Sequence, residues 1–382
     1  MRYRWTILGA GVVAQASFSA LLIGLASIAP AIQHRYGLSL AQVGVVLAAV
    51  NIGTVVTLFP WGLLADRIGE RKTIGVGLTG CGAAVAGAAF AGSFGALIAF
   101  LALGGALGGC VQSASGRAVM SWFAPAERGL ALGIRQTAVP LGGAIAAVLL
   151  PALAAGPGLR WSFLALAVGA GLGAAVGLAL LRDAPAGELE AELVRPLRDR
   201  RLWLLCGGST LYLAGQFAIL GFVVLFLHEH RGFSNRAAAG VLAAVQVLGG
   251  VARIVAGRWS DRLRKRIVPL LWIGVSLAAA LVLSSALVDA SLWLLVPSLL
   301  VAGTFGLSWN GLSYTAAAER AGAARSGAAI GIQQTTLAMG SIVFPIAFAA
   351  VVDAASWRLG YLLVALCPLA GFVALRPLAE RS

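Results

Sequence analysis

Long apolar stretches separated by short polar segments run along the whole chain. Twelve of these stretches hold about 20 residues each with very few charged side chains, and a helix needs roughly 20 apolar residues to cross a bilayer. Helices are expected because lipid leaves backbone groups without hydrogen-bonding partners. The predicted spans are residues 6–29, 42–64, 73–91, 95–121, 130–153, 161–181, 202–227, 237–259, 267–288, 291–316, 327–352 and 358–375.

The composition places the chain among integral membrane proteins. It is 60% hydrophobic and 11% charged over 382 residues, whereas a soluble domain is about half apolar and a quarter charged. That excludes an ordinary soluble enzyme, a disordered protein and a secreted disulfide scaffold. The four cysteines lie in separate apolar stretches, and the sequence shows no nucleophile–base pair, phosphate loop or metal-ligand spacing. We therefore predict neither enzymatic activity nor a cofactor or metal site.

The net charge of +14 reflects orientation in the membrane rather than nucleic-acid binding. With the N-terminus placed inside, 20 of the 28 Lys and Arg residues fall on the inner side and five on the outer side. Basic residues concentrate on the cytoplasmic side of membrane proteins. We predict a multi-pass protein of the inner (plasma) membrane, with both termini cytoplasmic. The Ala, Gly, Leu and Arg bias favours a bacterial source, and we expect a monomer.

The sequence repeats itself across a polar segment at 182–201. The predicted organisation is an all-α membrane protein of twelve helices in two six-helix pseudo-repeats, 1–181 and 202–382, joined by a cytoplasmic linker. Parallel repeats of this kind place a substrate site between the halves. The paired segments are 47–51 with 242–246, 62–67 with 257–262, 133–137 with 331–335, and 126–128 with 318–320.

One loop carries a family signature. Residues 62–72 read Gly-Leu-Leu-Ala-Asp-Arg-Ile-Gly-Glu-Arg-Lys, with a degenerate copy at 257–262. This resembles the Gly-x-Leu-Ala-Asp-Arg-x-Gly-x-Arg-Lys loop of the major facilitator superfamily, and the resemblance implies a secondary transporter that works by alternating access. The Asp66 carboxylate can accept from helix N-terminal amides or a nearby Arg, which would latch one conformation. The predicted latch residues are Gly62, Asp66, Arg67, Arg71, Asp261 and Arg262.

The predicted spans contain three arginines and no carboxylate, which points to an anionic substrate. A charge inside the bilayer is costly unless it is paired or hydrated, and a guanidinium binds carboxylates bidentately. Residues 253–261 are similar to span eight of monocarboxylate and oxalate transporters, and that resemblance assigns the substrate carboxylate to Arg253. Arg135 has Gln333 as its repeat counterpart, which would suit an asymmetric ligand. Arg117 is either a substrate ligand or a partner of Asp66 or Glu127.

Polar side chains in the spans could orient the ligand, or they could simply hydrogen bond between helices. These candidates are Gln15, Asn51, Gln216, Gln246, Asn310, Gln333 and Tyr212.

The predicted function is transport of a small organic anion, most simply a carboxylate. The driving ion stays open between a co-transported proton and exchange for another anion. The alternative is drug/proton antiport, but such antiporters often carry an Arg early in span four, where this chain reads Phe-Leu-Ala-Leu-Gly at 100–104. Their Gly-Pro-x-x-Gly-Gly motif is matched only in part at 139–143.

Overall fold

The computed structural model describes residues 3–182 and 196–379, and it is helical throughout these ranges. Eleven helical stretches among the described residues are long and apolar enough to cross a membrane. The predicted span that is not among these eleven is 73–91, which corresponds to helix α4, Glu70–Ala88, whose first three residues are all charged. Many large apolar side chains lie on the outside of the helices, including Val148 at 78% exposure and Val56 at 71%. Such surfaces are compatible with lipid and not with water.

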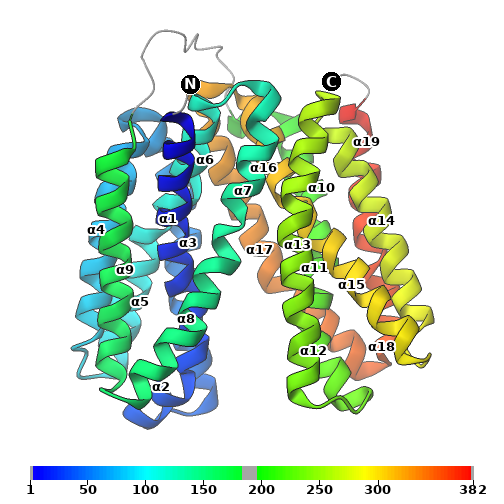
Figure 1. Ribbon diagram of the computed structural model, residues 1–382, viewed down its shortest axis with the longest axis horizontal. Coiled ribbons are helices and arrows are strands. Elements are labelled where there is room, and N and C mark those ends of the chain that lie inside the picture. The colour runs from blue at the N-terminus through cyan, green and yellow to red at the C-terminus, as the bar shows by residue number, and fades with distance from the viewer. Residues whose placement is uncertain (1–2, 183–195, 380–382) are drawn as a thin grey trace. The chain divides into compact units, whose positions relative to one another are not determined.

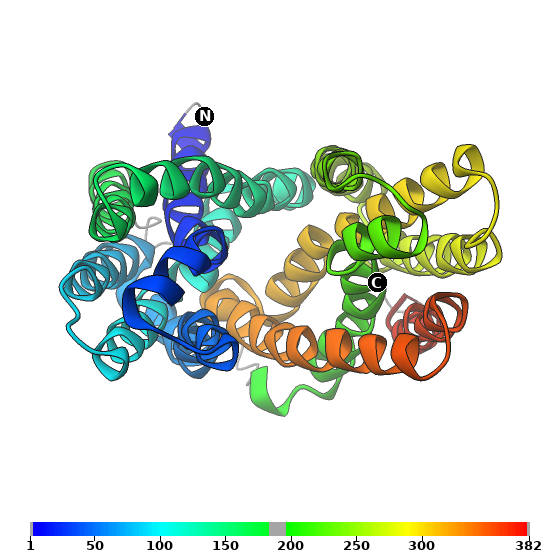
Figure 2. The same ribbon diagram turned by 90° about the horizontal axis from the view of Figure 1, so that it is seen from below.

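The chain divides into two compact units, each described here by itself. Unit 1 contains described residues 3–123, 137–182 and 321–335. Its helices lie side by side as a bundle (Figures 1 and 2), and they comprise α1 (Tyr3–Gly24), α2 (Ala29–Tyr36), α3 (Leu40–Ile68), α4 (Glu70–Ala88), α5 (Phe94–Gly108), α6 (Cys110–Trp122), α8 (Ala138–Ala155), α9 (Leu159–Leu180) and the first part of α17 (Ser326–Ala354).

Unit 2 contains described residues 124–136, 196–320 and 336–379. Most of the predicted linker, residues 183–195, lies outside the described residues. The helices of unit 2 are α7 (Arg128–Gln136), α10 (Arg200–Thr210), α11 (Tyr212–Leu220), α12 (Val223–Leu225), α13 (Asn235–Leu263), α14 (Ile267–Ala286), α15 (Leu292–Ser308), α16 (Asn310–Ala321), the rest of α17, α18 (Trp357–Val364) and α19 (Leu366–Ala379).

Serine caps begin several of these helices. The Ser39 hydroxyl accepts from the Gln42 backbone, and the Gln42 side chain accepts from the Ser39 backbone, which completes a capping box before α3. Ser93, Ser234 and Ser356 cap α5, α13 and α18 in the same way through the side-chain oxygen.

Glycines allow α3 and α5 to approach closely within unit 1. A Cβ on Gly53 or Gly105 would collide with the facing backbone carbonyl oxygen of Ala102 or Val50, respectively. The resulting proximity lets Trp61 Nε1 and Thr57 Oγ1 donate to Ala106 O, at 2.6 and 2.7 Å. The small residues thus permit hydrogen bonds between helices in a setting where apolar burial gives little association energy.

The repeat is visible in the helices. Helices α3 and α13 each span 29 residues at an offset of 195. The broken pair α5 and α6 has its counterpart in α15 and α16. One predicted pairing is wrong: residues 318–320 lie inside α16, whereas the turn Pro125–Glu127 has its structural counterpart in the turn Ala323–Arg325. The two Ala-Glu-Arg segments therefore have the same sequence but occupy different positions in the two repeats.

Candidate functional site

Asp66 caps the start of a helix within unit 1. Its Oδ1 accepts from Gly327 N at 3.0 Å, and its Oδ2 accepts from Ala328 N at 2.8 Å. These amides belong to the first turn of α17, where backbone N–H groups lack intrahelical partners and the helix dipole favours an anion. A Cβ on Gly327 would lie 2.7 Å from both Asp66 Oδ1 and Gly62 O. The carboxylate can therefore reach both amides only because residue 327 is glycine.

Arg117 completes this group with a second carboxylate. Its Nε donates to Asp66 Oδ1 at 3.1 Å, and its Nη1 donates to Glu70 Oε2. The Glu70 side chain is fully buried, and that of Arg117 is 8% exposed. The structure thus favours the ion-pair alternative for Arg117 over substrate contact, although the partners are Asp66 and Glu70 rather than Glu127.

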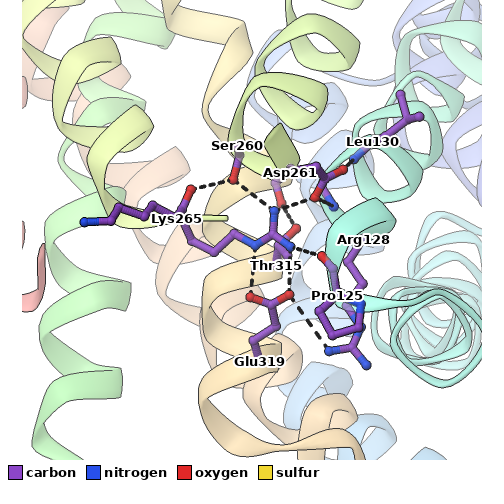
Figure 3. Close-up of polar contacts among 11 residues, drawn as sticks. Pro125, Arg128, Leu130, Ser260, Asp261, Lys265, Thr315 and Glu319 are labelled. Atoms are coloured by element: carbon purple, nitrogen blue, oxygen red, sulfur yellow. Dashed lines mark hydrogen bonds and ion pairs between the residues drawn. The ribbon is translucent and has the colours of Figure 1, made fainter. Parts of the chain in front are cut away.

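Asp261 makes the same cap in unit 2 (Figure 3). Its Oδ1 accepts from Gly129 N at 3.0 Å, and its Oδ2 accepts from Leu130 N at 2.8 Å. These amides belong to the first turn of α7. A Cβ on Gly129 would lie 2.8 Å from Asp261 Oδ1, so this helix start also requires glycine.

Arg266 is the cation beside Asp261, and the protein satisfies all its donors. Nε and Nη2 donate to Glu319 at 2.9 Å each, while Nη1 donates to Ser260 Oγ at 3.0 Å and Asp261 Oδ1 at 2.5 Å. Nη2 also donates to Pro125 O (Figure 3). A guanidinium has five N–H groups, so none is left over. Burial has the largest effect on the pKa of Arg266 and lowers it, but Glu319 and Asp261 outweigh burial and hold that pKa above its usual range.

The remaining predicted latch arginines do not join these two groups. Arg67 and Arg262 are exposed, and the Arg71 Nε donates to Leu178 O at 2.8 Å. Sequence reasoning missed Glu70, Arg266 and Glu319. Arg266 could not be singled out because residues 258–266 hold five bases, and the two acids offered a signal only in combination with the repeat.

Arg253 is a buried arginine that bonds only to main-chain oxygens among the described residues. Its Nε donates to Leu307 O and its Nη1 to Gln136 O, at 2.9 Å each. No described carboxylate lies within ion-pair distance. Its Nη2 has no described partner, and the residue keeps 6% of its surface exposed. A charged fork with open donors is suited to binding an oxyanion.

Arg135 lies in the same part of unit 2. It is fully buried, and its Nη1 donates to Gln136 Oε1 at 3.1 Å. Tyr314 interacts electrostatically with both guanidiniums and hydrogen bonds the Gln136 side chain. The structure therefore groups two predicted substrate ligands, Arg253 and Arg135, with two residues that sequence reasoning did not select, Gln136 and Tyr314.

Three of the predicted amides, Gln15, Gln216 and Asn310, belong to two equivalent pairs, one in each unit, and the fourth member, Gln112, was not predicted. In unit 1 the Gln15 Nε2 donates to Gln112 Oε1 at 3.2 Å. In unit 2 the Asn310 Nδ2 donates to Gln216 Oε1, also at 3.2 Å. Gln112 also accepts from Gln334 at 2.9 Å. These contacts are what interhelical hydrogen bonding would give.

The other predicted ligands are dispersed. Tyr212 donates to Leu270 O at 3.1 Å, and the Asn51 amide bonds back to Leu47 O of its own helix at 3.3 Å. Gln246 is half-buried, and Gln333 is buried in unit 1.

The comparison with known families decides the class of protein. A profile described as Major Facilitator Superfamily matches residues 7–345. The chain belongs to the major facilitator superfamily. A transporter of this superfamily is not an enzyme, and it is a multi-pass membrane protein that moves a small molecule.

The chain is similar to several bacterial transporters of the superfamily. An uncharacterized MFS-type transporter of Mycobacterium tuberculosis is 36% identical over 374 residues, covering 96% of this chain and 83% of the relative. The probable sulfoacetate transporter of Cupriavidus necator is 29% identical over 64% of this chain and 62% of its own length. The hexuronate transporter of Bacillus subtilis is 25% identical over 67% and 63%.

Solved structures of the superfamily share the fold. The structure of the MFS proton:xylose symporter bound to 6-bromo-6-deoxy-D-glucose has a TM-score of 0.80, covering 99% of this chain and 96% of that one at 15% identity. At this identity the likeness establishes the fold alone. The predicted all-α architecture of a major facilitator is thereby confirmed.

Proposed function

We propose that this secondary transporter moves a small organic anion, and that Arg253 binds the anionic group with Arg135 beside it. The observation that carries the proposal is the bonding of Arg253. Two of its donor groups are held by main-chain oxygens, while its Nη2 has no described partner. Two carbonyl oxygens fix the side chain but do not balance its charge, so an incoming carboxylate would do so.

The relatives agree with this chemistry. Two relatives have names that refer to sulfoacetate and to hexuronate, and both compounds are organic anions with a carboxylate. The neighbouring residues also suit an oriented ligand, because Arg135, Gln136 and Tyr314 would add directional donors around one pole of the anion. The proposal covers the class of substrate and not one compound.

Uptake into proteoliposomes tests the assignment. The panel contains sulfoacetate, glucuronate, oxalate, lactate and an uncharged sugar, and the variants are Arg253→Gln and Arg253→Lys. Loss of a charge-assisted hydrogen bond costs about 1.5–3 kcal/mol, so Arg253→Gln should lower the efficiency of anion uptake by about 10- to 100-fold. Arg253→Lys should keep part of the uptake efficiency, since lysine retains the positive charge but lacks the bidentate guanidinium.

The matched control is Arg258→Gln, on the same helix but exposed, which should leave uptake unchanged. Melting temperatures separate misfolding from loss of binding. Unchanged anion kinetics in a folded Arg253→Gln protein would remove Arg253 from the site. Uptake driven by a pH gradient would indicate proton symport, and uptake driven by anion on the opposite side would indicate exchange.

Drug/proton antiport is the competing function. It needs a carboxylate that can bind a cation and cycle a proton, yet Asp66, Glu70 and Asp261 are engaged in the two helix-capping groups. Resistance of expressing cells to lipophilic cations, together with no anion uptake, would favour that function over ours.

A further inference from the structure

A basic cavity lies at one end of unit 2, separate from Arg253. It has a volume of about 220 Å³ and is lined by Arg201 of α10, Arg264, Lys265 and Arg266 of the α13–α14 connection, and Arg320 of α16. Glu319 is the acid in the lining. The lining thus holds five bases, of which Arg266 and Arg320 are paired with acids.

Three of the five basic side chains make no hydrogen bond or ion pair with a described residue. All the N–H groups of Arg266 donate to Asp261, Ser260, Glu319 and Pro125. Arg320 forms an ion pair with Asp199 at 2.7 Å. The side chains of Arg201, Arg264 and Lys265 are exposed and make no hydrogen bond or ion pair with a described residue. The positive charge available to a ligand therefore comes from these three residues.

The backbone keeps this turn in an unfavourable conformation. Arg264 has φ +52° and ψ +29°, and it is the one non-glycine residue with positive φ in the described chain. Residues with a Cβ rarely adopt this region, and strained positions concentrate at functional sites. The counterpart in unit 1 is Gly69, followed by the buried Glu70. Both turns thus have a positive φ, but only unit 2 places a residue with a Cβ there, so the repeat does not require the arginine.

The lining also includes apolar side chains, namely Leu205, Ile267 and Leu378. The cavity is smaller than the 300–1,000 Å³ typical of sites for drug-sized ligands, so it can take a compact anionic group but not a whole lipid. Basic pockets between membrane helices are suited to phospholipid headgroups. An apolar wall beside the bases would accept the glycerol and the start of an acyl chain.

We propose that this cavity binds a phosphate group through Arg201, Arg264 and Lys265. The phosphate belongs either to an anionic phospholipid or to a soluble phosphate compound. A phosphate oxygen would accept charge-assisted hydrogen bonds from two guanidiniums and one ammonium. The site takes no part in binding the transported anion.

The test uses the purified full-length protein in detergent. Its melting temperature is measured with phosphatidylglycerol, with diacylglycerol, which lacks the phosphate, and with inorganic phosphate, and native mass spectrometry counts the bound lipid. The test variant is Arg201→Gln/Lys265→Gln. The matched control is Arg200→Gln/Arg258→Gln, which removes two charges from α10 and α13 at exposed positions outside the cavity lining.

We expect phosphatidylglycerol to raise the melting temperature of the wild type and of the control, because a ligand of the folded state stabilises it. The test variant should bind at least about tenfold more weakly, since it loses two of the three side chains that would make charge-assisted hydrogen bonds. An effect of phosphatidylglycerol alone identifies a lipid, and an effect of inorganic phosphate alone identifies a soluble ligand. An effect of both shows that the phosphate group suffices.

Three results would overturn the proposal: no shift with either phosphate source, an equal shift with diacylglycerol, or equal binding by the test variant and the control. The melting temperature of the test variant without lipid shows whether it folds.

Discussion

The two helix-capping aspartates have the same geometry but are supported by opposite arrangements of charge. Asp66 and Asp261 each accept two backbone N–H groups, at 3.0 and 2.8 Å. In unit 1 the base, Arg117, lies on α6 and the acid, Glu70, begins α4. In unit 2 the acid, Glu319, lies on α16 and the base, Arg266, precedes α14.

This inversion separates what the repeat requires from what it leaves free. The bond between a carboxylate and a helix start depends on backbone geometry, which both units retain. The supporting ion pair depends only on opposite charges at two neighbouring positions, and either order satisfies that requirement. We propose that both groups act as conformational latches, and three changes test how alike they are.

The largest difference should come from removing the two supporting arginines. Arg117→Met takes a counter-charge from Glu70, which is fully buried, and breaking a buried pair costs about 3–5 kcal/mol. Arg266→Met should cost less, about 1–3 kcal/mol, because the Glu319 side chain is 23% exposed and can be hydrated. Melting temperatures in detergent check the order.

Neutralising the acid provides the control for that prediction. Glu70→Gln combined with Arg117→Met should recover part of the lost stability, since the fully buried Glu70 then carries no unpaired charge, while Asp66 loses its arginine partner in both variants. Equal destabilisation by the two single arginine variants would show that burial of the acid does not set the cost.

An intermediate effect should follow from Asp66→Asn and Asp261→Asn, and here the units should agree. An amide offers one acceptor oxygen where the carboxylate offers two, so one helix-start N–H loses its partner at a cost of about 1–3 kcal/mol. Transport rates in proteoliposomes should fall by a similar factor in both variants. Asp289→Asn, at a pair whose side chains are 58% and 64% exposed, should change little. Loss of transport in only one aspartate variant would break the equivalence.

The smallest effect concerns the turns that follow α3 and α13. Arg264→Gly should raise stability by about 0.5–1 kcal/mol, because glycine adopts positive φ without steric cost. Arg264→Ala removes the same charge but keeps the strain, so it should bring no such gain. In unit 1, Gly69→Ala should destabilise, since φ +84° with ψ +163° is a conformation open essentially to glycine alone. Thermal unfolding of the three variants checks this order, and a gain from Arg264→Ala would mean that charge repulsion, not strain, dominates the turn.

The sequence was sufficient for the fold and for the two aspartates. Apolar stretches of bilayer length and the repeated loop lead directly to the helices and to Asp66 and Asp261. It was insufficient for their partners, because Arg266 is one of five bases between 258 and 266. Only its place beside Ser260, Asp261 and Glu319 distinguishes it.

The arginines inside the spans show the same limit. The free-energy cost of a charge inside a membrane identified Arg117, Arg135 and Arg253 together as candidate functional residues. The sequence left Arg117 open between a substrate and a carboxylate partner, and it did not show that Arg253 meets the carbonyls of Leu307 and Gln136. Such assignments depend on how helices distant in the chain are rotated against each other.

The complete bonding of Arg266 has a consequence for leakage. A cation drawn into an apolar protein usually brings water molecules with it, and a file of water can conduct protons. All the hydrogen-bond acceptors of Arg266 are oxygen atoms of the protein, so this charge does not need a file of water to solvate it, although its side chain lines the basic cavity. A membrane carrier thereby gains a structural cation whose solvation does not depend on water that could conduct protons.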